Sequence, residues 1–117
     1  PELFRHLCSQ NAEIITLPSA FTKVTGKAHW QTLLQARAIE NQVYVVASAQ
    51  TGIHQNGRET WGHSMIINPW GDVLACHEQD EGFVSAEFSR EKLLSVRASM
   101  PVAEHNQYTV KLKVKNE

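Results

Sequence analysis

Residues 43–49 read Val43-Tyr44-Val45-Val46-Ala47-Ser48-Ala49, an apolar run rich in β-branched side chains. This composition predicts a buried β-strand. A second short apolar run, at residues 13–18, predicts another strand. Between the two lies a stretch with helical spacing, from Thr25 to about Gln42, whose apolar positions are Trp30, Leu33, Leu34 and Ala38. Strand, helix and strand in this order predict a crossover within one sheet, which is right-handed when the strands are parallel. The fold class is therefore expected to be α/β.

The segments that flank this unit carry their own patterns. Residues 1–10 predict a helix, because Pro stands at its first position and apolar side chains form one stripe. No strand or loop precedes that first helical turn, so we expect the chain to be a piece of a longer protein. Residues 51–60 are polar, contain two glycines and predict a loop. Strands at 61–67 and 72–77 are predicted around a type I turn at residues 68–71, which read Asn-Pro-Trp-Gly.

The last third of the chain is predicted to contain a strand, a helix and a strand-like tail. Residues 82–88 are expected to form a short strand. Ser89 is placed to cap a helix that ends before Pro101. From residue 108 to residue 115, apolar side chains alternate with threonine and lysine, as in a strand with one buried face.

Composition excludes several classes of protein. The chain has 117 residues, 42% of them hydrophobic and 20% charged, which suffices for one core and is too short for two. Lys and Arg total 11 and Asp and Glu total 12, so no overall field favours nucleic acid or an anionic membrane. The longest apolar runs are strand-sized, far below a membrane span. Two cysteines in no close motif fit a reducing compartment, and we expect a cytoplasmic protein.

The cysteines and histidines offer little support for catalysis or metal binding. Cys8 lies toward the far end of its helix, where the dipole opposes a thiolate, and is expected in the core. Cys76 and His77 are neighbours in a predicted strand, so their side chains should point to opposite faces. The histidines fall on different elements with no pair at i and i+4, and no metal site is predicted.

Two charged groups admit more than one interpretation. Glu40 could be a catalytic acid, or it could pair with Arg37 one turn earlier; the pair is favoured because an unpaired buried carboxylate is costly. The lysines at 111, 113 and 115 could contact a phosphate backbone, but no stacking aromatic side chains alternate with them. Lysine on an edge strand commonly discourages unwanted pairing, so no nucleic-acid binding is predicted.

Five segments, taken together, resemble the nitrilase superfamily of carbon-nitrogen hydrolases. They match it in order and spacing over nearly the whole chain, and within it they are most similar to the branch of omega-amidases and deaminated-glutathione amidases. The segments are Pro1-Glu2-Leu3-Phe4-Arg5, Leu17-Pro18-Ser19-Ala20-Phe21-Thr22, Thr25-Gly26-Lys27-Ala28-His29-Trp30, Ala36-Arg37-Ala38-Ile39-Glu40-Asn41-Gln42 with the strand that follows, and Trp61-Gly62-His63-Ser64 through Asn68-Pro69-Trp70-Gly71.

This resemblance implies an α-β-β-α sandwich, of which residues 1–117 would be the incomplete C-terminal part. It implies a cofactor-free, homo-oligomeric amidase that cleaves the amide of a small acid, such as deaminated glutathione or an alpha-keto-acid amide, through a Cys thioester. In the family the Cys, a general-base Glu and an oxyanion-stabilising Lys lie upstream of the Pro-Glu-Leu segment. The chain alone is therefore expected to lack catalytic residues and to be inactive. The alternative is a non-catalytic remnant, or a partner subunit for an intact or complementary chain.

The resemblance also points to substrate contacts. In the family, the loop after the next strand lines the pocket, and that loop matches residues 19–22, so Phe21 and Thr22 are the first candidates. Thr25 and His29 are further candidates, and Glu2 is expected to hold the start of the first helix. The residues by themselves place this loop after the carboxyl end of a strand, where α/β folds contact ligands, but they leave open whether Phe21 is a contact or a core plug.

Overall fold

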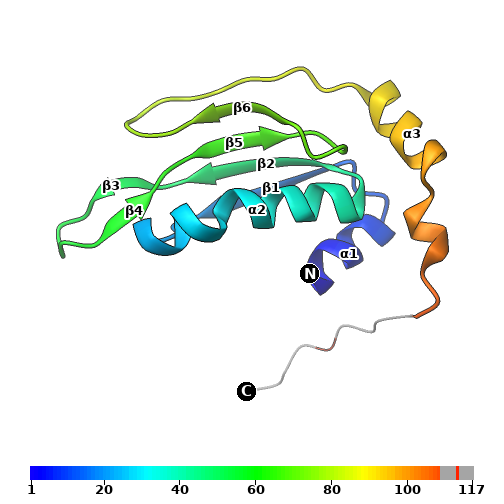
Figure 1. Cartoon of the computed structure of the whole chain (residues 1–117), viewed down its shortest axis with the longest axis horizontal. Helices are drawn as coiled ribbons and strands as arrows, with labels where there is room; N and C mark the ends of the chain where they lie inside the picture. The colour runs from blue at the N-terminus through cyan, green and yellow to red at the C-terminus, as the bar shows by residue number, and fades with distance from the viewer. Residues whose placement is uncertain (109–112, 114–117) are drawn as a thin grey trace.

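The computed structural model describes residues 1–108 and residue 113. At its centre lies a four-stranded sheet with the order β1-β2-β5-β6. β1 (Ile14–Ser19) runs parallel to β2 (Tyr44–Ala49). β5 (Ser64–Ile67) is antiparallel to β2, and β6 (Val73–His77) is antiparallel to β5. Helix α2 (Lys23–Asn41) connects β1 to β2 and lies along the sheet, which confirms the predicted strand–helix–strand unit (Figure 1).

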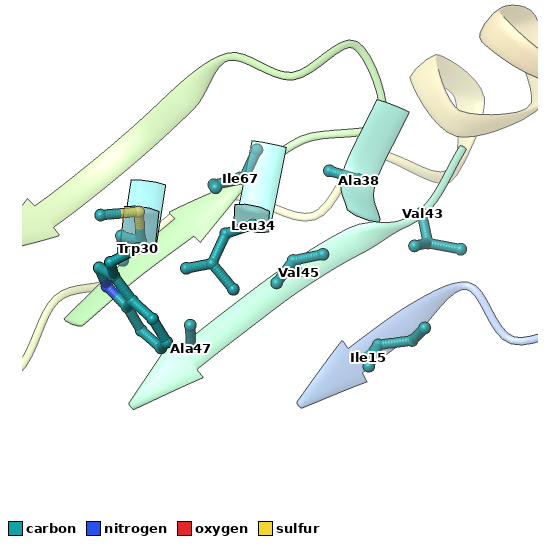
Figure 2. Close-up of a cluster of buried hydrophobic side chains, with 9 residues drawn as sticks. Ile15, Trp30, Leu34, Ala38, Val43, Val45, Ala47 and Ile67 are labelled. Atoms are coloured by element: carbon teal, nitrogen blue, oxygen red, sulfur yellow. The ribbon is translucent and has the colours of Figure 1, made fainter. Parts of the chain in front are cut away.

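The core lies between α2 and one face of the sheet. Trp30, Leu34 and Ala38 of α2 are at most 2% exposed and follow each other at i, i+4 and i+8, the spacing of one helix face. Figure 2 shows these side chains directed at strand residues that include Val45 and Ala47. Leu33, from the same predicted stripe, is 42% exposed because it lies off that row. The predicted helical pattern is therefore confirmed for three of its four apolar positions.

Helices α1 (Glu2–Ser9) and α3 (Arg90–Ser99) lie toward the C-terminal end of α2 (Figure 1). Arg97 of α3 donates from Nε to the Gln42 carbonyl at 3.1 Å and from Nη2 to the Ala12 carbonyl at 2.8 Å. These two carbonyls stand in the turns that precede β2 and β1, so one guanidinium ties α3 to both. The predicted cap at Ser89 is confirmed, because its hydroxyl accepts from the Lys92 backbone N–H at 3.1 Å. A short 3-10 helix, η1 (Val102–His105), follows Pro101.

A four-residue turn joins β5 to β6 at the predicted residues, 68–71. The Gly71 backbone N–H donates to the Asn68 carbonyl at 3.0 Å, which closes the four-residue turn. Gly71 has a φ of +96° and lies against the Ile39 side chain, where a Cβ would be 2.6 Å from Ile39 Cδ1. Both constraints explain why glycine occupies the last turn position.

Three of the expected elements are wrong in whole or in part. The strand predicted at 61–67 is interrupted at residues 62–63, so Trp61 belongs to β4 and Ser64–Ile67 form β5. The predicted loop at 51–60 contains β3 (Thr51–Ile53) and most of β4 (Glu59–Trp61), which pair as an antiparallel hairpin that projects beyond one end of the sheet (Figure 1). The predicted strand at 82–88 is absent from the described structure, because this segment pairs with no strand there, and Phe83 is 90% exposed. The predicted tail strand lies outside the described residues, apart from Tyr108 and Lys113. Within the described part of the chain, no helix combines the length and apolarity needed to cross a membrane.

Candidate functional site

The predicted substrate loop, residues 19–22, lies where β1 ends and α2 begins. Thr22 occupies the N-cap position of α2 with an extended backbone, so the helix begins two residues before the predicted Thr25. The Thr22 and Thr25 hydroxyl oxygens are 2.8 Å apart and share a hydrogen bond. His29 is exposed and follows Thr25 by four residues, hence on the same helix face. Three of the four predicted contacts thus occupy the N-terminal half of α2 and its cap.

Phe21 packs toward the core instead. It is half-buried and contacts the core cluster, and its ring centroid lies 5.0 Å from that of Trp30 in a tilted arrangement. The indole N–H of Trp30 donates to the His63 carbonyl at 2.8 Å, which fixes the ring that Phe21 touches. This packing supports the core-plug interpretation of Phe21, and only the exposed part of its ring is available to a substrate.

Residues for which the sequence predicted no role hold this loop in place. The Trp61 backbone N–H donates to the Phe21 carbonyl at 3.0 Å, and Thr22 forms an antiparallel bridge with Thr60. Thr60 is 5% exposed, and its hydroxyl is 2.9 Å from His54 Nε2. Trp61 belongs to one of the family-like segments. Its strand, β4, has only three residues, which is too short for a sequence pattern to predict a role for Trp61.

Two cavities formed by described residues are lined by none of the four predicted contacts. One, of about 280 Å³, lies between the β3–β4 hairpin, residues 79–81 and Lys23, whose ammonium donates to Glu59 Oε1 at 2.7 Å. The other, of about 440 Å³, lies between α1, the end of α2 and the region of η1. Phe21, Thr22, Thr25 and His29 lie outside both of these cavities, and their role as substrate contacts stays a prediction.

Neither cysteine has the surroundings of a nucleophile. Cys8 is partly buried against the core, and burial raises the pKa of its thiol despite the opposing effect of Arg97. Partial burial also raises the pKa of Cys76, and the negative charge of Glu78 adds to the shift. A raised pKa means less thiolate at neutral pH, and the thiolate is the reactive form. Both environments therefore oppose covalent catalysis.

The charged groups near the helix ends are paired. Arg37 Nη1 donates to Glu40 Oε1, which confirms the predicted pair, and Arg5 lies 3.8 Å from the other carboxylate oxygen. Glu2, in the first turn of α1, has a lowered pKa, chiefly because its backbone N–H bonds the carboxylate and further because of the N-terminal ammonium. Among the described residues, no three His, Cys, Asp or Glu side chains come together as a metal site.

Comparison with known proteins identifies close relatives. The sequence profile of the family described as Carbon-nitrogen hydrolase matches residues 1–98. A deaminated glutathione amidase of Synechocystis sp. is 51% identical over 108 residues, which cover 92% of this chain and 40% of the relative. The nitrilase and fragile histidine triad fusion protein NitFhit of Drosophila melanogaster is 54% identical over 97 residues, which cover 82% of this chain and 21% of that protein.

Solved structures share the fold. The crystal structure of the C. elegans NitFhit protein superposes with a TM-score of 0.84 at 46% identity, over 93% of this chain and 27% of that one. Nit3 of Saccharomyces cerevisiae, a member of branch 10 of the nitrilase superfamily, gives a TM-score of 0.86 at 32% identity, over 92% of this chain and 40% of that one. The predicted nitrilase-like α/β fold is confirmed, and the chain spans at most two fifths of these relatives.

Proposed function

Because the chain belongs to the carbon-nitrogen hydrolase family, we propose that residues 1–117 form part of an amidase that acts on a small acid. The observation that carries the proposal is the 51% identity to a deaminated glutathione amidase over 92% of this chain. The proposed substrates are accordingly deaminated glutathione or another alpha-keto-acid amide, cleaved through a Cys thioester. We call the proposed amidase that contains these residues the complete enzyme.

We place the catalytic Cys, Glu and Lys of this enzyme outside residues 1–117. Two observations support this: the chain spans 40% of the deaminated glutathione amidase named above, and both of its thiols have raised pKa values. A cysteine placed a few residues before Pro1, at the start of α1, would lie near the positive end of the helix dipole, which lowers the pKa of a thiol. Free backbone N–H groups at the same helix start would be available to an oxyanion.

Phe21 and Thr22 are proposed to line the substrate pocket of the complete enzyme. Phe21 would supply an apolar wall with the part of its ring that Trp30 leaves uncovered. The Thr22 hydroxyl can donate one hydrogen bond and accept others, so it can bond a substrate carboxylate while it stays within reach of Thr25. Thr25 and His29 would extend the contact surface along α2.

The chain alone is expected to hydrolyse neither deaminated glutathione nor an alpha-keto-acid amide. Removing one member of a cooperating catalytic group removes nearly all the benefit of the others, and we place all three members outside the chain. Chromatography of the released amine or ammonia measures the reaction, with the complete enzyme assayed in parallel as the positive control. Turnover by the chain alone, with a thioester trapped on Cys8 and located by mass spectrometry, would falsify the proposed division of the catalytic groups.

Thr22→Val in the complete enzyme is expected to lower kcat/KM by about tenfold to a hundredfold. Valine keeps the shape of threonine and deletes its donor, and loss of one hydrogen bond to a charged group corresponds to roughly 1.5–3 kcal/mol. Steady-state kinetics measure the effect, and thermal denaturation checks that the fold is retained. Thr32→Val, at an exposed position of α2, is the matched control and should leave kcat/KM unchanged. Wild-type kinetics in Thr22→Val would remove Thr22 from the site.

A further inference from the structure

The candidate substrate loop, residues 19–22, is hydrogen-bonded to the β3–β4 hairpin as well as to its own neighbours in sequence. We propose that the hairpin positions this loop for substrate, and that the contact between Trp61 and Gly26 sets the distance between hairpin and α2. The inference rests on the proposed function in one respect: it takes Phe21 and Thr22 as substrate contacts. Trp61 and Gly26 are positioning residues that act through the loop.

Three consecutive backbone carbonyls of the loop accept hydrogen bonds from residues 50–61. The Gln50 backbone N–H donates to the Ser19 carbonyl at 2.9 Å. Arg58 Nη2 donates to the Ala20 carbonyl at 3.4 Å, and the Trp61 backbone N–H donates to the Phe21 carbonyl at 3.0 Å. The peptide planes of the loop are therefore oriented by the hairpin and by Gln50, which directly precedes it, so a shift of the hairpin moves the loop with it.

The hairpin also contacts the first turns of α2. A Cβ built on Gly26 would lie 2.2 Å from Trp61 Cβ and 2.3 Å from Trp61 Cγ, far inside van der Waals contact. Glycine inside a helix costs about 1 kcal/mol relative to alanine, so a helical glycine is explained by a neighbour that leaves no room for a side chain. The Trp61 ring also stacks on the His63 ring, with centroids 4.0 Å apart and planes at 4°. Trp61 thus contacts both α2 and the segment that joins β4 to β5.

The Trp61–Gly26 contact and the loop share one short stretch of chain. Gly26 donates its backbone N–H to the Thr22 carbonyl at 2.7 Å, and Trp61 donates its own to the Phe21 carbonyl. Any change in the spacing between hairpin and helix must therefore alter the relative placement of Phe21 and Thr22. A misplacement of about 1 Å in a substrate-positioning group can cost about a hundredfold in rate, so the spacing matters to the reaction even though neither residue needs to touch substrate.

Gly26→Ala is the direct test, made both in this chain and in the complete enzyme. The added methyl must push Trp61 away, so the Trp61 amide should exchange with solvent at least about tenfold faster in hydrogen–deuterium exchange, because its bond to Phe21 is weakened. In the complete enzyme we expect KM to rise by about tenfold or more with a smaller change in kcat. Val24→Ala is the matched control, since Val24 is 81% exposed on the same turn of α2, and it should change neither measurement.

A surface variant covers the case in which Gly26→Ala does not fold. Arg58→Ala removes only the donor to the Ala20 carbonyl from an exposed side chain, so the fold should persist. We expect a rise in KM of about threefold with kcat retained, and recovery toward wild type in Arg58→Lys, which restores a cationic donor. If Arg58 contributed only to the stability of the fold, Arg58→Lys would not restore KM.

The outcomes separate this inference from the proposed function. Faster exchange at Trp61 together with raised KM in Gly26→Ala and not in Val24→Ala supports it. Unchanged exchange at Trp61 overturns the positioning role, whatever the kinetics. Faster exchange with unchanged KM overturns the link between hairpin and substrate. If the wild-type complete enzyme cleaves no amide, the proposed function fails, and the exchange measurement alone still decides whether the hairpin holds the loop.

Discussion

Replacing Trp30 with alanine is expected to lower the free energy of unfolding by about 3–5 kcal/mol, the range for deletion of a large aromatic side chain from a core. Trp30 is 1% exposed and packs against the sheet and the Phe21 ring. Its indole N–H also donates to the His63 carbonyl, so the substitution both opens a cavity and removes a partly buried hydrogen bond. Urea denaturation followed by circular dichroism measures the change.

Two further variants test this explanation for Trp30. Trp70→Ala makes the same substitution at a position that is 57% exposed, and it should lower the free energy of unfolding by no more than about 0.5 kcal/mol. Trp30→Phe keeps an aromatic ring and deletes the donor to His63, which should cost about 1–3 kcal/mol. Equal losses in Trp30→Ala and Trp70→Ala would show that the packing of α2 on the sheet is not the main source of stability.

Asn68→Ala is expected to lower the free energy of unfolding by about 2–4 kcal/mol, although it removes few atoms. Asn68 is fully buried. Its side-chain carbonyl accepts hydrogen bonds from the backbone N–H groups of Trp70 at 2.9 Å and Asp72 at 3.0 Å. Its side-chain amide donates to Asp72 Oδ2 at 2.8 Å. Alanine deletes all three of these hydrogen bonds, and a typical hydrogen bond contributes about 0.5–1.5 kcal/mol to stability. The same denaturation experiment measures the loss.

Asn56→Ala provides the matched control for Asn68. Asn56 lies at the exposed tip of the β3–β4 hairpin, where its side chain accepts one bond, from the Arg58 backbone N–H at 3.0 Å. Its replacement should change the free energy of unfolding by no more than about 0.5 kcal/mol. Should Asn68→Ala unfold at the same urea concentration as the wild type, the turn would contribute nothing through its side-chain bonds.

The parts of the fold that the sequence predicted well are elements whose own residues carry the signal. β1, α2 and β2 each contain enough residues to display a period, and the buried row of Trp30, Leu34 and Ala38 follows directly from it. The turn at 68–71 was equally predictable, because Asn, Pro and Gly each have a local conformational reason to stand where they do. In both cases the signal lies within the element itself.

The errors fall where structure depends on distant residues. β3 and β4 have three residues each, and β4 is held by bonds to Phe21 and Thr22, some forty residues earlier in the chain. Residues 82–88 have a strand-like composition and find no partner among the described residues. For Phe21 the sequence left two interpretations open, and only the position of the Trp30 ring showed how much of the side chain the core occupies. A contact between residues that are far apart in the chain leaves no signal in the local sequence pattern of either residue.

The position of proline in β1 bears on how copies of this chain would meet. The Glu13 and Ser19 carbonyls accept from Tyr44 and Gln50 on the β2 side, so odd-numbered residues of β1 direct their backbone groups at β2 and even-numbered ones direct theirs outward. Pro18 is therefore an outward-facing position that has no N–H to donate. A second molecule that tried to extend the sheet at β1 would find donors at Ile14 and Thr16 and none at Pro18, which limits fibre-like self-association along this border.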